Sequence, residues 1–243
     1  MASTLAAIRE QGLIAVMEGA APDRVFEWAM AVSKGGIELL AIPAQLPNVT
    51  ELVSDLDDVE GLVVGICGVL QPEDVSIAVA AGGEFVITPV VDEAIVTAAT
   101  SRGLVTIVGA TTPSEVHRAL ALGADLVSVH PAGAMARPDA YFKSIARTFP
   151  GEPLAASGCV DVETATALLE AGAAAALVDR GVFPDSKDPE AADIITMRAI
   201  GLVEVCAEVL GMPKRSSFTD LRQNETPREG AEPLNADDFE FMG

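Results

Sequence analysis

Short apolar runs alternate along this chain with amphipathic stretches, and each amphipathic stretch ends at a glycine. Glycine suits a helix C-terminus, because a residue at positive φ costs least without a Cβ. Each following run is short and continuously apolar, as expected of a parallel strand buried on both faces. The junctions recur roughly every 20–28 residues, at Gly12, Gly36, Gly61, Gly83, Gly103, Gly123, Gly151 and Gly172.

Repeated strand–helix units in a chain of 243 residues predict an α/β fold, a (β/α)8 TIM barrel rather than an open doubly wound sheet. We expect residues 1–212 to form the barrel domain, with a short N-terminal helix over residues 3–11 covering its bottom. Residues 213–243 lose the apolar periodicity and are polar, which predicts an extended acidic C-terminal tail. Because such barrels place their sites at the C-terminal ends of the strands, candidate chemistry is sought there.

Several predicted helices begin with recognisable signals. Residues 22–34 form a predicted helix that opens at Pro22, where the missing N–H is harmless. Thr112 precedes Pro113 and is followed three residues later by Glu115, which predicts a capping box. Asp161 is expected to open a helix that follows the seventh strand.

Composition limits the class of protein. The net charge of −21 argues against partnership with nucleic acid or anionic membrane surfaces. No run of about 18 apolar residues exists, so no membrane insertion is expected. Cys67, Cys159 and Cys206 are odd in number and fall within predicted elements, which fits reduced thiols. Together these features predict a soluble, acidic, cytoplasmic protein.

Four ordered blocks of sequence resemble the 2-keto-3-deoxy-6-phosphogluconate (KDPG) and 2-keto-4-hydroxyglutarate aldolases. They are GICGVLQPED at 65–74, FVITP at 85–89, VGATTPSE at 108–115 and GADLVSVHPA at 123–132. The resemblance extends from about Gly12 to Phe183. It implies a homotrimeric barrel of class I aldolases and no cofactor.

The same resemblance implies that the covalent chemistry is lost. The family forms a Schiff base through a lysine on strand 6, where this chain has Ser128. A serine cannot condense with a ketone to form an iminium ion. The family's proton-shuttling glutamate falls on Ala41, its carboxylate-binding arginine on Gln45, and its threonine after strand 3 on Gly68.

A phosphate site is implied by the resemblance at the loops after strands 7 and 8. Ser157 and Gly158 can donate hydrogen bonds to an anion, and Arg180 can add a fork of donors. Asp179 opposes this, because it would repel a phosphate or close a salt bridge with Arg180. The candidate ligand-binding residues at the predicted strand ends are Thr88, Pro89, Ser157, Gly158, Arg180 and Gly181.

Two further residues are candidate acids or bases. His130 can act as a general acid or base, or it can fill an aromatic position of its strand. Glu18 can supply a carboxylate to the pocket, or it can be a solvated loop residue. Cysteine, histidine and aspartate at strand ends can bind zinc, but here they come from separate strands, and we expect no metal site.

Three function classes stay open, and whether the chain is an enzyme is not decided. The first is a non-catalytic trimeric scaffold or partner-binding subunit, with Phe239, Phe241 and Met242 of the tail as docking anchors. The second is a carbon–carbon lyase or other enzyme acting on a 2-keto acid or sugar phosphate without a Schiff base. The third is a small-molecule sensor. A mouth filled by side chains favours the scaffold, and an open polar mouth favours the others.

Overall fold

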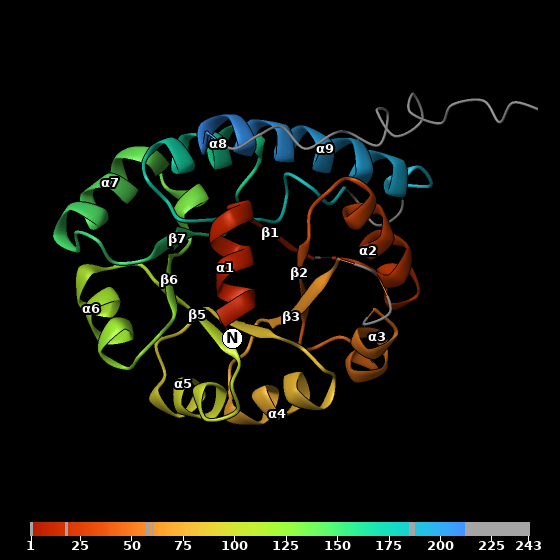
Figure 1. Ribbon diagram of the computed structural model, residues 1–243, viewed down its shortest axis with the longest axis horizontal. Helices are drawn as coiled ribbons and strands as arrows, with labels where there is room; N and C mark the ends of the chain where they lie inside the picture. Colours follow the sequence, from red (N-terminus) through yellow and green to blue (C-terminus); the bar gives the residue numbers. More distant parts are fainter. Residues whose placement is uncertain (1, 18, 57–58, 60, 185–187, 212–243) are drawn as a thin grey trace, which may run out of the picture.

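The protein is a closed barrel of parallel strands, seen in a computed structural model that describes residues 2–17, 19–56, 59, 61–184 and 188–211. The strands pair in sequence order, and β8 pairs with β1 to close the barrel (Figure 1). They are β1 (Leu13–Val16), β2 (Leu39–Pro43), β3 (Val63–Cys67), β4 (Phe85–Thr88), β5 (Val105–Ala110), β6 (Leu126–Val129), β7 (Leu154–Ala156) and β8 (Ala176–Val178). The predicted TIM barrel is confirmed.

Helices ring the barrel, and α1 lies across its centre at one end (Figure 1). The predicted helix 22–34 forms as a 3₁₀ turn, Pro22–Arg24, followed by an α-helix. A second 3₁₀ turn spans Ala132–Ala134. The α-helices are α1 (Ala2–Gln11), α2 (Val25–Lys34), α3 (Val49–Leu56), α4 (Pro72–Ala80), α5 (Glu93–Thr100), α6 (Pro113–Ala121), α7 (Pro138–Thr148), α8 (Val162–Glu170) and α9 (Ala191–Val209).

Most of the helix caps and helix-end glycines predicted from the sequence are present in the structure. Thr112 and Glu115 form the expected capping box at α6, and the Asp161 side chain caps α8. Most of the junction glycines have positive φ, but at the fourth junction the left-handed residue is Gly82, and the prediction of Gly83 was wrong. Gly83 instead packs near the backbone of Ala78 and Val64, where a Cβ would be crowded.

Two apolar cores stabilise the fold. One lies between the strands and the outer helices, and the other fills the barrel interior. Ile8 of α1 belongs to the inner core, which explains how this helix closes the bottom. Phe85 is fully buried in the interior, and its ring occupies the space that a side chain at Gly65 would need. The glycine of β3 therefore permits the largest residue of the inner core.

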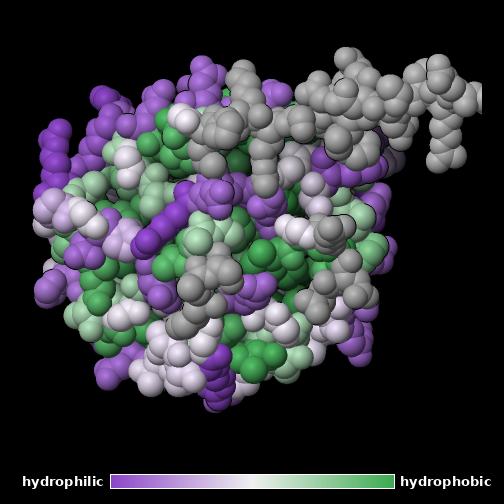
Figure 2. Space-filling view, in the orientation of Figure 1, coloured by the Kyte–Doolittle hydropathy of each residue, from purple (hydrophilic) through white to green (hydrophobic). Residues whose placement is uncertain are grey.

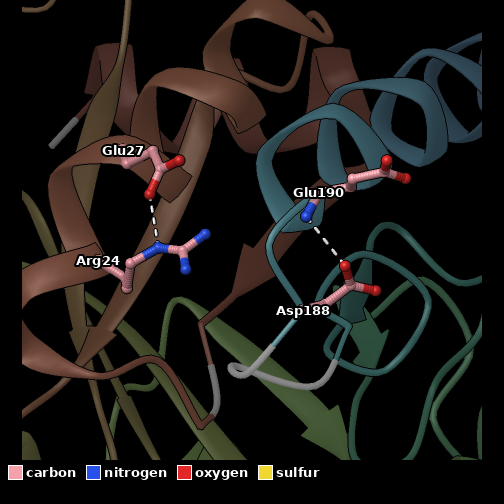
Figure 3. A network of polar contacts seen from close by, with 4 residues as sticks. All are labelled: Arg24, Glu27, Asp188 and Glu190. Carbon is pink, nitrogen blue, oxygen red and sulfur yellow. Dashed lines mark hydrogen bonds and ion pairs between the residues drawn. The ribbon is translucent and has the colours of Figure 1, made fainter.

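The starts of α2 and α9 carry local polar contacts, shown together in Figure 3. Arg24 pairs with Glu27 at 2.5 Å between Nε and Oε2. The backbone N–H of Glu190 donates to the Asp188 carboxylate at 2.9 Å. Both contacts fix the chain where it enters a helix, and α2 and α9 then pack side by side.

The surface around α1 mixes polar and apolar residues. Hydrophilic residues are spread around the rim and across this face, with apolar residues between them (Figure 2). No helix in the described ranges combines the length and the apolar character needed to span a membrane.

We expect Gly65→Ala to destabilise the protein by about 1–3 kcal/mol, the usual effect of overpacking. The added Cβ would lie 2.4 Å from the Phe85 ring. Urea denaturation measures the change, and the cost should shrink in a Phe85→Leu background, where the ring is gone. Gly201→Ala is the matched control: Gly201 lies in α9 with no neighbour within 4 Å, so alanine should stabilise by roughly 0.5–1 kcal/mol. Equal costs in both Phe85 backgrounds would contradict this account of the inner core.

Candidate functional site

An open cavity of about 310 Å³ lies at the C-terminal ends of the strands. This is the end at which barrels of this type carry their sites. The side chains of the described residues therefore do not fill the mouth. The cavity is lined by Val16, Pro43, Gln45, Cys67, Gly68, Ile87, Thr88, Pro89, Gly109, Ser128, His130, Ser157, Gly158, Leu177 and Asp179.

A chain of hydrogen bonds connects two hydroxyls and an imidazole on one wall of the cavity. Ser128 Oγ donates to Ser157 Oγ at 2.7 Å, and Ser157 Oγ lies 3.1 Å from His130 Nδ1. Ser128 donates to Ser157, so the Ser157 proton is free to point at His130 when Nδ1 is the acceptor. This arrangement can pass a proton between the cavity and the imidazole.

His130 is held by its backbone. Thr111 Oγ1 donates to the His130 carbonyl at 2.5 Å, and Tyr141 donates to the Thr111 carbonyl at 2.6 Å. Glu115 accepts from the Thr111 N–H at 2.9 Å, which connects the capping box of α6 to the same support. Burial lowers the pKa of His130 below its ordinary value, and the negative charge of Asp179 opposes this only in part. The imidazole is therefore neutral near pH 7.

Asp179 follows β8, and its carboxylate is turned to backbone donors. Oδ2 accepts from the N–H of Cys159 at 2.8 Å. Oδ1 accepts from the N–H of Val160 at 2.8 Å and from that of Arg180 at 2.7 Å. Three N–H groups from the loops after β7 and β8 thus converge on a single carboxylate.

Four positions carry other residues than the family's lysine, glutamate, arginine and threonine, and the structure brings only some of them together. Ser128, Gln45 and Gly68 all line the cavity. Gln45 Nε2 donates to the Gly68 carbonyl at 2.7 Å, so two of these positions also contact each other. Ala41 lies deeper, in the apolar core inside the barrel.

The candidate ligand-binding residues divide into two groups. Thr88, Pro89, Ser157 and Gly158 line the cavity. Arg180 and Gly181 are not among the residues that line it; Arg180 has an exposed side chain. Their part in binding a ligand stays a prediction.

Some predicted residues fall outside the described ranges. Glu18 is one, and the tail anchors Phe239, Phe241 and Met242 are the others. Within the described ranges, no three of the metal-ligating types histidine, cysteine, aspartate and glutamate cluster closely enough to hold a metal ion.

Sequence reasoning missed how Asp179 is used. It was interpreted as a charge that repels phosphate or pairs with the Arg180 guanidinium, whereas its hydrogen bonds go to backbone N–H groups. A signal was present: Leu177 and Asp179 are two residues apart, so both point to the same face of the strand. Leu177 belongs to the inner core, which places Asp179 at the inner mouth.

Comparisons with known proteins agree with this architecture. The sequence signature of the family "Aldolase: KDPG and KHG aldolase" matches residues 5–197. The chain is 27% identical over 167 residues to the 2-dehydro-3-deoxy-6-phosphogalactonate aldolase of Escherichia coli K12, covering 68% of this chain and 80% of that protein.

Two solved structures share the fold. One is the 2-keto-3-deoxy-6-phosphogluconate aldolase of Zymomonas mobilis ZM4 with 3-phosphoglycerate, with a TM-score of 0.73 and 22% identity over 82% of this chain and 93% of that one. The other is a cube-shaped, highly porous protein cage designed by fusing symmetric oligomeric domains, with a TM-score of 0.75 and 22% identity over 88% of this chain and 76% of that one.

We expect His130 to make stability depend on pH. Since burial lowers its folded-state pKa, the imidazole takes up a proton on unfolding once the pH falls below about 6.5. The contribution is present above that value and is lost as the pH falls through the folded-state pKa. The free energy of unfolding should therefore drop less between about pH 7.5 and about pH 5.5 in His130→Gln than in the wild type, by urea denaturation.

The control for this comparison is His117→Gln, because the chain has two histidines and His117 is exposed on α6. That variant should keep the wild-type dependence on pH. The same drop in His130→Gln as in the wild type would show that the imidazole is not desolvated.

Proposed function

The chain belongs to the KDPG and KHG aldolase family, and on that premise we propose that it is an enzyme that has replaced Schiff-base chemistry with proton transfer. Its substrate is a small carbonyl compound. The reaction is enolisation next to that carbonyl, driven by hydroxyls and an imidazole rather than by a lysine.

The observation that carries this proposal is the hydrogen-bonded chain of Ser128, Ser157 and His130 in an open cavity. An apolar residue at Ser128 would suffice for a barrel that only serves as a scaffold. Instead the buried hydroxyl is hydrogen-bonded to a second one, and both contact the space that a ligand would fill. The relative named as an aldolase supports a reaction at a carbonyl.

The chemistry follows from the state of each group. When Ser128 turns its hydroxyl from Ser157 to a carbonyl oxygen in the cavity, the new hydrogen bond stabilises negative charge that develops on that oxygen. His130 is neutral and can take the proton from the adjacent carbon through Ser157, whose own proton passes to Nδ1 as its oxygen receives the one from carbon, leaving an enol or enolate. The imidazolium then returns the proton to carbon, so proton and charge balance within the pair. General-base catalysis of this type contributes about 10²–10⁴-fold.

A trimeric scaffold is the second candidate. Leu70, Val79 and Val90 are exposed apolar residues on two consecutive units, with relative exposures of 59%, 43% and 41%. The relative built from symmetric oligomeric domains supports assembly. Contact with a partner through Phe239, Phe241 and Met242 stays a prediction. Because the cavity is open, the enzyme is the better supported of the two.

The proposal is tested by proton exchange in D2O, followed by proton NMR. Hydroxyacetone, dihydroxyacetone and pyruvate serve as probes. We expect at least one to exchange protons next to its carbonyl, and the rate to fall about 10²–10⁴-fold in His130→Gln because the base is removed. Ser128→Ala should lower the rate less, and His117→Gln should leave it unchanged.

Borohydride trapping of the wild type in the presence of pyruvate, read by intact mass, completes this test. No covalent adduct is expected, since Ser128 cannot form an iminium ion. A trapped adduct would show that the protein forms a Schiff base, and it would contradict the proposal. If no probe exchanges protons, the enzyme proposal is contradicted and the scaffold becomes the favoured function.

Assembly gives a separate prediction. We expect the full chain to have about three times the monomer mass by light scattering, as the family resemblance implies. The charge of −21 per chain repels between subunits, so moderate salt should stabilise the trimer by screening. Val79→Glu should weaken it, whereas Asp139→Glu, a change at a partly exposed position that keeps the charge on α7, should not. A monomer mass at every salt concentration would contradict the predicted trimer.

A further inference from the structure

Beside the cavity, backbone N–H groups that could bind an anion donate instead to a side chain of the protein. Asp179 has a relative exposure of 5%, yet its carboxylate lines the cavity. Its two oxygens take the three backbone N–H groups of Cys159, Val160 and Arg180. Successive backbone N–H groups that converge in this way form a concavity suited to anions.

The loop that supplies two of these donors is built for this shape. Gly158 and Cys159 both have positive φ, at 83° and 58°, which is uncommon for a residue with a side chain. Gly133 donates to the Gly158 carbonyl at 2.9 Å, and a Cβ at Gly133 would lie 2.2 Å from the Cys159 carbonyl oxygen. The loop is thus held from both sides with its N–H groups toward Asp179.

The described part of the cavity wall offers no compensating positive charge. Among the lining residues of the described chain, Asp179 is charged and none is a lysine or arginine. His130 is neutral near pH 7 because of burial. A phosphate or carboxylate entering here would meet a like charge and no cation among the described lining residues.

We propose that Asp179 acts as a built-in anion that closes this subsite and restricts the pocket to uncharged hydroxy-carbonyl compounds. The inference rests on the proposed function, because it names the substrate class of the same cavity. The hydroxyls of Ser128, Ser157 and Thr88 suit such a ligand, since each can donate or accept a hydrogen bond. The apolar wall of Val16, Ile87 and Leu177 can cover its carbon skeleton.

The first test compares matched ligands by calorimetric titration of the wild-type protein. Dihydroxyacetone is paired with dihydroxyacetone phosphate, and hydroxyacetone with pyruvate. Each uncharged member should bind on the order of tenfold or more tightly than its anionic partner, because like charges in a confined site repel. Equal or tighter binding of the anionic member would overturn the proposal.

The second test vacates the subsite and uses inorganic phosphate as the probe. Asp179→Ala leaves three N–H groups without their acceptor and should lower the melting temperature. Phosphate should raise the melting temperature of this variant, beyond the effect of chloride at equal ionic strength, because it binds the folded state. The wild type should show no such rise. Asp179→Asn, which keeps an acceptor oxygen and loses the charge, serves if the alanine variant does not fold.

Asp92→Ala is the matched control, since the exposed Asp92 carboxylate also accepts two backbone N–H groups, at the start of α5. It should lose stability without specific rescue by phosphate. Rescue confined to the Asp179 variants supports the occupied subsite whether or not any carbonyl compound binds, so it is independent of the proposed function. Rescue of the wild type or of Asp92→Ala to the same extent would overturn it.

Discussion

Closure of the parallel barrel is the constraint on which the other features depend. Pairing of β8 with β1 leaves no free edge and fixes which face of every strand is inside. Because side chains alternate along a strand, Leu126 and Leu177 in the inner core place Ser128 and Asp179 at the inner mouth. Closure also fixes the volume to be filled, which Phe85 occupies at the expense of a side chain on Gly65.

The described lining residues of the cavity balance their polar groups without a lysine or arginine. A buried carboxylate needs strong compensation, and Asp179 receives it from three backbone N–H groups rather than from an arginine or lysine. The neighbouring hydroxyls satisfy each other and the imidazole, so Ser128 and Ser157 are buried without an unpaired group. The resulting site has a wall of hydrogen-bonding groups and an apolar wall, and its one charged residue among those described, Asp179, is satisfied internally. Such a site suits hydrogen bonding to an uncharged ligand.

The family fold and the chemistry at its mouth are separable. The framework that holds the strands is the one shared with the family, whose signature extends through residues 5–197. The groups that face the cavity are a small set and can change without disturbing either apolar core. Support for His130 shows the connection between them. Thr111, just before α6, donates to the His130 carbonyl, and Tyr141 of α7 donates to the Thr111 carbonyl, so residues of the outer ring position a group at the mouth.

The sequence by itself determined the elements and their order, because glycine at helix ends, capping residues and apolar runs act over a few neighbouring residues. It also gave the candidates Ser128, His130, Ser157 and Gly158, since each lies at a strand end. Only the tertiary structure decided how they meet. Ser128 and Ser157 are 29 residues apart in the chain and contact each other through the stagger of β6 against β7. The partners of Asp179 are backbone N–H groups, which every residue except proline carries. Their convergence depends on the geometry of the loops, which the residue types do not predict.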